Sequence, residues 1–268
     1  MLTDIQVKEY LDLLGFESNP TPDKATLDEL ILRHQSTIPF QTVTLHRTGT
    51  LPSLDSQDVY EKVVERRLGG YCFELNKAFY ELLVALGYNA RPCISRAVRG
   101  REGRMPINHR GILVELDDGV YSADVGFGGP MPAGAMKLEE GCEQVIEGDT
   151  YIAEQADDTW WKLDRLTRSS KDLYDDGVPE RRQTELEICT AAVEEIDFDS
   201  MNHFFSQPGT LFHDHEIANL RIDGGYYGLM DDVFTKREGG EKEVVPLEDQ
   251  EAVDNVLAEY FGIVDAEK

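Results

Sequence analysis

The spacing of apolar residues predicts helices over most of the first 88 positions of the chain. Apolar residues three or four positions apart form one face of each expected helix. These faces are Val7, Tyr10, Leu11 and Leu14; Leu27, Leu30 and Ile31; Val59, Val63 and Val64, in a helix that starts at Ser56; and Phe79, Leu82, Leu83 and Leu86. The stretch IPFQT at positions 38–42 interrupts the pattern as an extended piece. The chain is therefore expected to begin as a group of helices.

From about Asn89 the pattern changes to the two-residue alternation of β-strands. Ile112, Val114 and Leu116 alternate with their neighbours, DDG at 117–119 marks a turn, and the strand-like VYSADV follows. Two such segments around a short glycine-containing turn predict a β-hairpin.

Short strands and one more helix complete the expected α+β order of helices, a β region and a small mixed tail. The polar stretch 164–183 is interpreted as a long surface loop or a strand pair. Further strands are expected within 144–152, 160–166, 220–230 and 242–247, and a closing helix contains Val253, Val256, Leu257 and Tyr260.

The composition indicates a folded globular protein, because 41% of the 268 residues are hydrophobic and the chain has 11 Phe and 11 Tyr. The first residues, MLTDIQVKEYLDLLGF, lack the basic segment and apolar run of a signal peptide. No apolar stretch approaches the length of a membrane span. We therefore expect a cytoplasmic protein with no membrane contact.

The cysteines and histidines predict neither a disulfide scaffold nor a metal site. Cys72, Cys93, Cys142 and Cys189 lie far apart with no C-x-x-C, which suits a reducing cytoplasm. The only close pair among the six histidines is in FHDHE at 212–216, where a polar loop is a better interpretation than a metal site.

The net charge of −26 argues against generic nucleic-acid binding, which needs a basic face. A high-salt or otherwise acid-rich cytoplasm would explain such a surface, although ordinary cytosolic proteins are also acidic. One segment differs: residues 91–110 hold six of the 16 arginines and a single acid, Glu102. This segment is either an attractor for an anionic ligand or a set of solvated strand and loop residues.

The sequence RRLGGYCFELN at 66–76 places Cys72 at a predicted helix start, directly after a glycine turn. Two glycines allow a tight or left-handed backbone, and a helix N-terminus favours a thiolate. A buried structural thiol is the alternative, and this stretch alone does not decide between them.

The predicted hairpin supplies the partners that a nucleophilic cysteine needs, because His109 begins one strand and Asp124 ends the other. With a turn at Asp118-Gly119, Asp124 would lie opposite Leu113, on the same face as His109 but roughly 13 Å away along the strand. A bulge or strong coiling near Gly111 is then expected to close that gap.

At this point the sequence resembles the arylamine N-acetyltransferase family over nearly its whole length. GGYCFELN resembles the family's nucleophile motif, PINHRGILVEL its histidine strand, and SADVGFGG its aspartate strand and following loop. The spacings of 37 and 15 residues between the three candidate residues also suit the family. IPFQT resembles the family's N-terminal I-P-F-E-N, and NHFFSQPGTLF resembles its later N-W-Y segment.

The resemblance implies Cys72 as nucleophile, His109 as its base and Asp124 as the residue that orients the base. It implies an acceptor pocket lined by aromatic and glycine positions, here Phe40, Phe127, Phe212, Gly128 and Gly129. It also implies a ping-pong transfer from acetyl-CoA to an arylamine, arylhydroxylamine or hydrazine, with no metal or prosthetic group. Because CoA carries phosphates, the exposed arginine candidates for its binding are Arg99, Arg101 and Arg104.

The implied fold has three parts around a core like that of cysteine proteases and transglutaminases. A helical bundle over 1–88 would carry the nucleophile, a β-barrel over 89–200 would carry the histidine and aspartate, and an α/β lid would span 201–268. The sequence does not predict the oligomeric state.

Two departures from the family pattern are visible. The family usually has Arg before the double glycine and Glu after Pro-Phe, where this chain has Leu68 and Gln41. If those charges normally pair, losing both together avoids a lone buried charge. Asn-Trp-Tyr is also replaced by Asn202-His203-Phe204, which affects the shape expected for the acceptor pocket.

Other classes of function fit the same residues. A cysteine hydrolase or a transglutaminase-like enzyme would use the same triad on an amide, and a related acyltransferase would use malonyl-CoA or propionyl-CoA. A non-catalytic binding protein is disfavoured because all three residue types of the triad are present.

Overall fold

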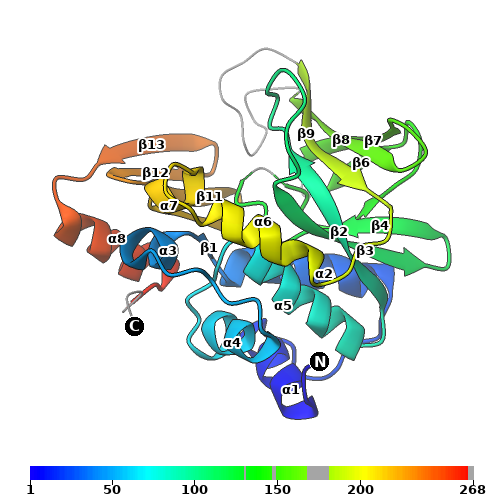
Figure 1. Ribbon diagram of the computed structural model, residues 1–268, viewed down its shortest axis with the longest axis horizontal. Coiled ribbons are helices and arrows are strands. Elements are labelled where there is room, and N and C mark those ends of the chain that lie inside the picture. The colour runs from blue at the N-terminus through cyan, green and yellow to red at the C-terminus, as the bar shows by residue number, and fades with distance from the viewer. Residues whose placement is uncertain (130, 147–148, 168–180, 265–268) are drawn as a thin grey trace.

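The structure is a computed structural model that describes residues 1–129, 131–146, 149–167 and 181–264 (Figure 1). Its helices are α1 (Asp4–Leu13), α2 (Lys24–Thr37), α3 (Val43–Thr48), α4 (Ser56–Tyr60), the π-helical turn η1 (Glu61–Glu65), α5 (Cys72–Ala85), α6 (Asp197–Phe205), α7 (Leu211–Asp214) and α8 (Gln250–Phe261). Its strands are β1 (Phe40–Gln41), β2 (Asn89–Ala97), β3 (His109–Leu116), β4 (Gly119–Ala123), β5 (Met136–Lys137), β6 (Glu143–Ile146), β7 (Asp149–Gln155), β8 (Trp160–Thr167), β9 (Arg181–Cys189), β10 (Ile217–Ile222), β11 (Gly225–Met230), β12 (Val233–Glu238) and β13 (Glu241–Pro246). This mixture confirms the α+β class.

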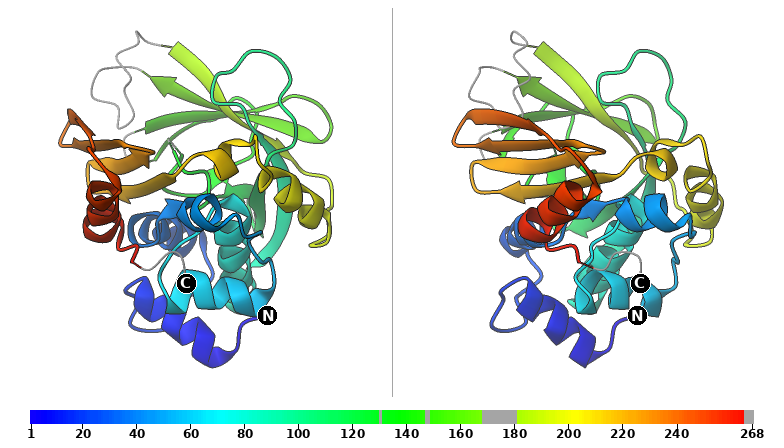
Figure 2. Two further views of the ribbon diagram at one scale, coloured as in Figure 1. Left: turned by 60° about the vertical axis from the view of Figure 1, so that its left-hand side comes forward. Right: turned by 90° about the vertical axis from the view of Figure 1, so that its left-hand side faces the viewer.

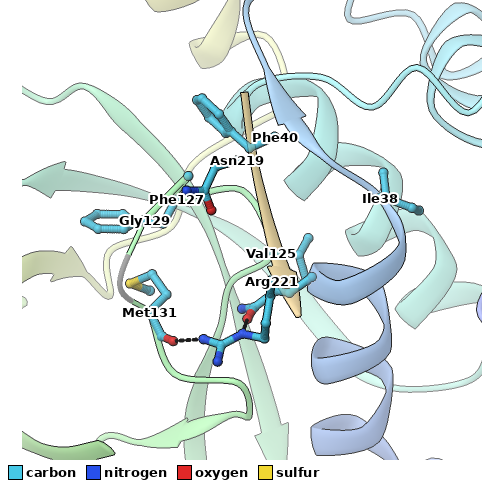
Figure 3. Close-up of a pocket in the computed structure, with 10 residues that line it drawn as sticks. Ile38, Phe40, Val125, Phe127, Gly129, Met131, Asn219 and Arg221 are labelled. Atoms are coloured by element: carbon cyan, nitrogen blue, oxygen red, sulfur yellow. Dashed lines mark hydrogen bonds between the residues drawn. The ribbon is translucent and has the colours of Figure 1, made fainter. Parts of the chain in front are cut away.

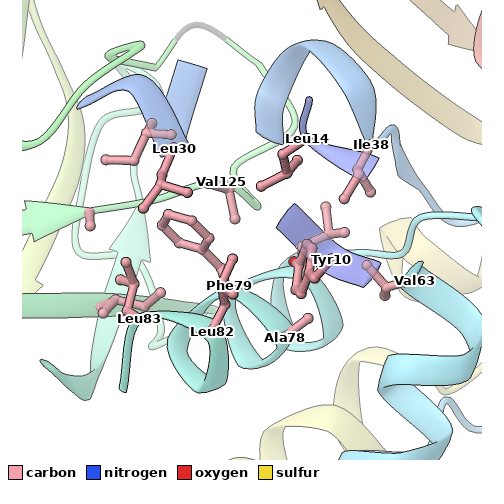
Figure 4. Close-up of a cluster of buried hydrophobic side chains, with 14 of the residues drawn as sticks. Tyr10, Leu14, Leu30, Ile38, Val63, Ala78, Phe79, Leu82, Leu83 and Val125 are labelled. Atoms are coloured by element: carbon pink, nitrogen blue, oxygen red, sulfur yellow. The ribbon is translucent and has the colours of Figure 1, made fainter. Parts of the chain in front are cut away.

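The predicted apolar faces of the N-terminal helices meet in one core beside α5 (Figure 4). Side chains cap the first two helices: Thr3 accepts a hydrogen bond from the Gln6 backbone N–H, and Asp23 accepts one from that of Thr26. The fully buried core side chains include Tyr10, Leu27, Leu30, Ile31, Phe79, Leu82 and Leu83. Hydrophobic burial therefore fixes α1 and α2 against the helix that begins at Cys72.

The helix expected from Ser56 through Val64 has the predicted buried face but not the predicted pitch. After α4 the chain widens into η1, where the backbone N–H of Arg66 bonds to the carbonyl of Glu61. Val63 and Val64 are both buried in this wider turn, while the Lys62 ammonium bonds to Glu74 at 2.6 Å. The predicted helix from Ser56 is therefore present, and it changes from α to π geometry at 61–65.

Eight strands form a nearly closed barrel in the order β5-β4-β3-β2-β9-β8-β7-β6. The Gln144 side chain joins its two end strands: Oε1 accepts from the Lys137 N–H at 3.0 Å, and Nε2 donates to the Lys137 carbonyl at 2.9 Å. The segment predicted as one strand over 144–152 is instead two antiparallel strands, β6 and β7. Within the polar stretch 164–183, β8 and β9 supply the ends, and 168–180 lies outside the described residues.

The hairpin formed by β3 and β4 has a different register from the one predicted. Leu116 pairs with Gly119, so the turn residues are Asp117 and Asp118, one position earlier than expected. A one-position shift of the turn moves the cross-strand partners by two. The next pair in this register joins Gly111 with Asp124, and no bulge appears between β3 and β4.

A second sheet, β1-β10-β11-β12-β13, packs against α8 near the C-terminus (Figure 2). Val253, Leu257 and Phe261 of α8 belong to one buried cluster with residues of this sheet. Its first strand, β1, comes from the N-terminal helical region and pairs Phe40 with Asn219. None of the helices in the described ranges is long and apolar enough to cross a membrane.

Candidate active site

Cys72 is the first residue of α5, as the glycine turn and helical spacing predicted, and its side chain is buried. Gly69 has a φ of +69°, and a Cβ there would lie 2.0 Å from the Pro39 carbonyl oxygen, so only glycine fits. The Glu74 carboxylate accepts a hydrogen bond from the Tyr71 N–H at 3.1 Å. The turn thus holds the sulfur at the positive end of the helix.

His109 and Asp124 are both buried and lie in direct contact. The His109 Nε2 is 2.5 Å from the Asp124 Oδ2. With Asp124 opposite Gly111, the two residues are separated along the strand by roughly 7 Å, because each strand residue adds about 3.3 Å. Side-chain reach spans that offset, which explains why no bulge is needed.

Interactions with Asp124 and with Cys72 oppose the effect of burial on the pKa of His109. Burial lowers the pKa of its imidazole, but the Asp124 charge, the hydrogen bond to Asp124 and a hydrogen bond with Cys72 together raise it to about 10. His109 is therefore hydrogen-bonded to Asp124 and interacts electrostatically with Cys72. Because Nε2 faces Asp124, Nδ1 is the ring nitrogen that remains for the sulfur.

Asn76 is a site residue that the sequence analysis missed. Its amide Nδ2 donates to the Arg110 carbonyl at 2.5 Å and to Asp124 Oδ1 at 3.0 Å, while its Oδ1 accepts from the Val125 N–H at 2.9 Å. It is fully buried and lies one helical turn after Cys72. A polar residue on the buried face of an otherwise apolar helix was the available signal.

The loop after Asp124 lies against the start of α5. A Cβ on Gly126 would be 2.9 Å from the Cys72 Cα and 3.0 Å from the Asn76 amide nitrogen. The Gly126 N–H donates to Asp124 Oδ1 at 2.9 Å. Glycine at this position is what allows the aspartate strand and the cysteine helix to approach so closely.

A pocket of about 30 Å³ lies between α2, β1, β10 and this loop (Figure 3). Phe40, Phe127, Gly128 and Gly129 line it, together with Gln35, Ile38, Val125, Met131, Asn219 and Arg221. Four of the five predicted acceptor-pocket residues therefore lie together. Cys72 is not part of the lining, but the Phe127 ring meets the His109 ring edge-on, with centroids 5.6 Å apart.

Phe212, the fifth predicted residue, does not line the pocket, and its ring packs against that of Phe40. Its ring centroid is 6.1 Å from that of Phe40 and 5.4 Å from that of Tyr71. Phe204, in the segment that departs from the family pattern, is exposed, whereas Asn202 is buried and accepts a hydrogen bond from the Tyr71 hydroxyl.

The six arginines of segment 91–110 divide into two groups. Three are used internally: Arg91 bonds to the Thr190 carbonyl, Arg96 to Glu187 and Arg110 to Glu195. The CoA candidates Arg99, Arg101 and Arg104 are the exposed members. Among these, the Arg99 guanidinium donates to the carbonyls of Phe127 and Gly128 at 2.7 and 3.1 Å and lies over the Phe127 ring.

Gln41 and Leu68 stand where the family usually has charged residues, and both are buried without a charge. Gln41 is buried, and its side chain exchanges hydrogen bonds with Thr44. Leu68 is buried in the apolar cluster under α8. Their segments remain joined through the backbone, because the Gln41 N–H bonds to the Gly70 carbonyl at 2.8 Å.

Within the described ranges, no group of three or more metal-binding side chains is present. In the FHDHE segment, His213 contacts Asp214 and His215 contacts Asp231. The histidine pair is thus engaged with carboxylates, but the predicted polar loop is instead the short helix α7 over Leu211–Asp214.

Comparison with known proteins identifies the family of this chain. The sequence profile of the N-acetyltransferase family matches residues 23–267. The arylamine N-acetyltransferase of Escherichia coli (strain K12) is 31% identical over 243 residues, which cover 89% of this chain and 82% of the relative.

Solved structures match over nearly the whole chain. The arylamine N-acetyltransferase from M. tuberculosis superposes with a TM-score of 0.87 at 28% identity, covering 97% of this chain and 95% of that one. The Mycobacterium marinum arylamine N-acetyltransferase in complex with CoA gives 0.84 at 26% identity, covering 96% and 92%.

The family profile, together with a fold that matches over nearly the whole chain, defines an acyl-transferring enzyme of the N-acetyltransferase class. The chain belongs to the arylamine N-acetyltransferase family.

Proposed function

We propose that this protein transfers an acetyl group from acetyl-CoA, through a thioester on Cys72, to an arylamine, arylhydroxylamine or hydrazine. The observation that carries the proposal is the position of His109, which is hydrogen-bonded to Asp124 and interacts electrostatically with Cys72 at the start of α5. The CoA complex of the Mycobacterium marinum relative supports acetyl-CoA as the donor.

The proposed first half-reaction starts from a Cys72 thiolate beside a His109 imidazolium. The sulfur attacks the acetyl carbonyl, the bond between carbonyl carbon and CoA sulfur breaks, and the departing CoA thiolate takes the proton from His109. In the second half-reaction the amine nitrogen attacks the thioester and gives its proton to His109. The Cys72 thiolate leaves, and the starting pair is restored.

Each partner in this scheme has a separate role. Asp124 holds the imidazole and stabilises its charged form, and Asn76 holds Asp124 and the loop that follows it. Phe40, Phe127, Gly128 and Gly129 would bind the acceptor ring, and Phe212 would support Phe40 from behind.

We infer that Arg101 and Arg104 contribute most of the local positive charge for the CoA phosphates. Both are exposed, whereas the Arg99 guanidinium is hydrogen-bonded to the Phe127 loop.

We also propose the division of the chain into three parts at 88/89 and 200/201. The start of β2 at Asn89 supports the boundary at 88/89, whereas 200/201 falls within α6 and β1 joins the C-terminal sheet. Four free cysteines suit a cytoplasmic location.

The decisive experiment is to incubate the protein with acetyl-CoA without an acceptor and then to measure its intact mass. One acetyl adduct is expected, absent in Cys72→Ala and removed by an arylamine. Labelling from malonyl-CoA or propionyl-CoA in preference to acetyl-CoA would contradict the donor. A mass unchanged by any acyl-CoA would favour an amide hydrolase or a binding protein.

A further inference from the structure

A cluster of charges next to the proposed catalytic residues joins the buried cations Lys77 and Arg110 to Glu195, whose side chain is 42% exposed. Lys77 belongs to α5, Arg110 to β3, and Glu195 to the segment that joins β9 to α6. The Arg110 Nη1 and Nη2 atoms bond to the two Glu195 oxygens at 3.1 and 2.6 Å. The Lys77 Nζ atom bonds to the same carboxylate at 3.0 Å.

Both cations directly follow residues that hold the site. Lys77 comes after Asn76 in α5, and Arg110 comes after His109 in β3. Two polar contacts therefore join α5 to β3 near the site. One is direct, from the Asn76 amide to the Arg110 carbonyl, and the other passes through Glu195.

The two cations are buried, and the half-exposed Glu195 carboxylate is what pairs them. The Arg110 side chain is completely buried and lies over the Phe198 ring at 4.4 Å, and the Lys77 side chain is 8% exposed. Burial opposes the ionisation of Glu195, but the hydrogen bonds and charges of Arg110 and Lys77 outweigh it and lower its pKa. Without Glu195, Arg110 would be a buried charge without its carboxylate.

The cluster also continues to α4. The Lys77 ammonium bonds to Glu81 at 3.0 Å, and the Ser56 hydroxyl bonds to the same Glu81 carboxylate at 2.6 Å. Glu195 thus links two groups of residues. One is the network of α4 and α5 that includes Lys77, and the other is Arg110 on the strand of His109.

We propose that Glu195 is a positioning residue for the reaction, because it binds one cation on the cysteine helix and one on the histidine strand and so fixes Cys72 relative to His109. This proposal rests on the proposed function. Cys72 and His109 serve both half-reactions, so a loosened link should slow both rate constants together. KM for acetyl-CoA and for the amine should change little, because Glu195 lines neither the pocket nor the exposed arginine segment.

Glu195→Gln in the full chain tests the link, and Glu194→Gln is the matched control because Glu194 is its exposed neighbour. The pre-steady-state rate of Cys72 acetylation should be measured with acetyl-CoA and with p-nitrophenyl acetate as donors. Intact mass gives the fraction of protein that can be acetylated, and each rate is expressed relative to that fraction. Misplacement of about 1 Å can cost roughly a hundredfold, so we expect a loss on the order of tenfold to a hundredfold with both donors. The control should match the parent, and Glu195→Asp should recover part of the rate.

A Glu195→Gln protein with a lower unfolding temperature but unchanged acetylation rates per site would overturn the proposal, because Glu195 would then only stabilise the fold. If Glu195→Gln does not fold, Lys77→Met removes the α5 side of the link while leaving Arg110 paired, and the same outcomes apply. Iodoacetamide alkylation of Cys72 at neutral pH gives a readout independent of acetyl transfer. Slower alkylation of the variant would support the link even if the parent were not acetylated by acetyl-CoA.

Discussion

Replacing Asp124 with asparagine tests the electrostatic basis of the proposed mechanism. The pKa of His109 is raised from 6.5 to about 10 despite burial, a difference of about 3.5 units. At about 1.36 kcal/mol per unit, the surroundings favour the imidazolium by on the order of 5 kcal/mol. The N-terminus of α5 contributes typically about 0.3–1 kcal/mol to a nearby charge. We therefore expect Asp124, the largest contribution that opposes burial, to matter more for the Cys72–His109 pair than the helix terminus does.

The surrounding donors determine how an asparagine at 124 would orient. Oδ1 already accepts from the Gly126 N–H and the Asn76 amide, so an asparagine would keep its oxygen there and turn its NH2 group toward His109. His109 Nε2 would then have to accept a hydrogen bond. The ring proton would move to Nδ1, and His109 could no longer take a proton from Cys72.

We expect Asp124→Asn to lower the pKa of His109 below 6.5, because burial would no longer be opposed by the aspartate charge. In the parent, the imidazolium should persist through neutral pH and disappear as the pH rises toward 10. In the variant, acetylation should slow by roughly 10²–10⁴-fold at neutral pH, the size typical of a lost acid–base group. Alkylation of Cys72 should shift to higher pH.

The assays are the pH profile of iodoacetamide alkylation, followed by intact mass, and an NMR titration of the histidine rings. Asp117→Asn is the matched control, because Asp117 is exposed in the turn of the same hairpin. An Asp124→Asn protein with the parent's alkylation profile would refute the reasoning. The thiolate would then depend on the helix terminus and not on the imidazolium.

Three further predictions follow from other residues. Cys72→Ala should abolish acetyl transfer. Iodoacetamide at neutral pH should label Cys72 before Cys93, because burial raises the pKa of the Cys93 thiol to about 12. Activity lost in step with Cys93 labelling would contradict this. His34→Gln should shift acid unfolding, followed by circular dichroism, to lower pH. Burial lowers the pKa of His34 from 6.5 to about 3, so up to ~5 kcal/mol of stability is lost as the pH falls through that range, and an unchanged midpoint would count against it. Replacing Arg101 and Arg104 together with alanine should raise KM for acetyl-CoA at low ionic strength and less at high salt, and a KM unchanged at low salt would exclude these residues from CoA binding.

The sequence predicted the elements of the site better than their distances. Cys72 at a helix start and His109 and Asp124 on neighbouring strands were predictable, because apolar periodicity and glycine positions are local signals. The separation predicted between His109 and Asp124 was too large, because DDG allows two turn positions one residue apart. Pairing is set by burial of whole strand faces, which the turn residues alone do not reveal.

Contacts between distant segments were beyond the reach of the pattern. Nothing local indicates that Glu195 binds a cation on each of two elements more than 80 residues earlier in the chain. Asn76 was visible only as a polar residue on an apolar face. The pocket likewise combines α2, β1 and β10, which pattern analysis can predict singly but cannot bring together.

The turn that carries Cys72 shows how the chain can do without two charges usual in its family. Lys62 and Glu74 form a partly buried ion pair at 2.6 Å, and the other Glu74 oxygen accepts from the Tyr71 N–H, directly before the nucleophile. A Cβ on Gly70 would lie 2.7 Å from that oxygen, so the second glycine is what admits the carboxylate. The π-helical turn η1 ends just before this segment and includes Lys62. Support for the cysteine turn thus comes from the preceding helix and from α5 itself. Because Lys62 already pairs with the buried Glu74, the apolar Leu68 can pack against α8 without leaving a buried charge unpaired.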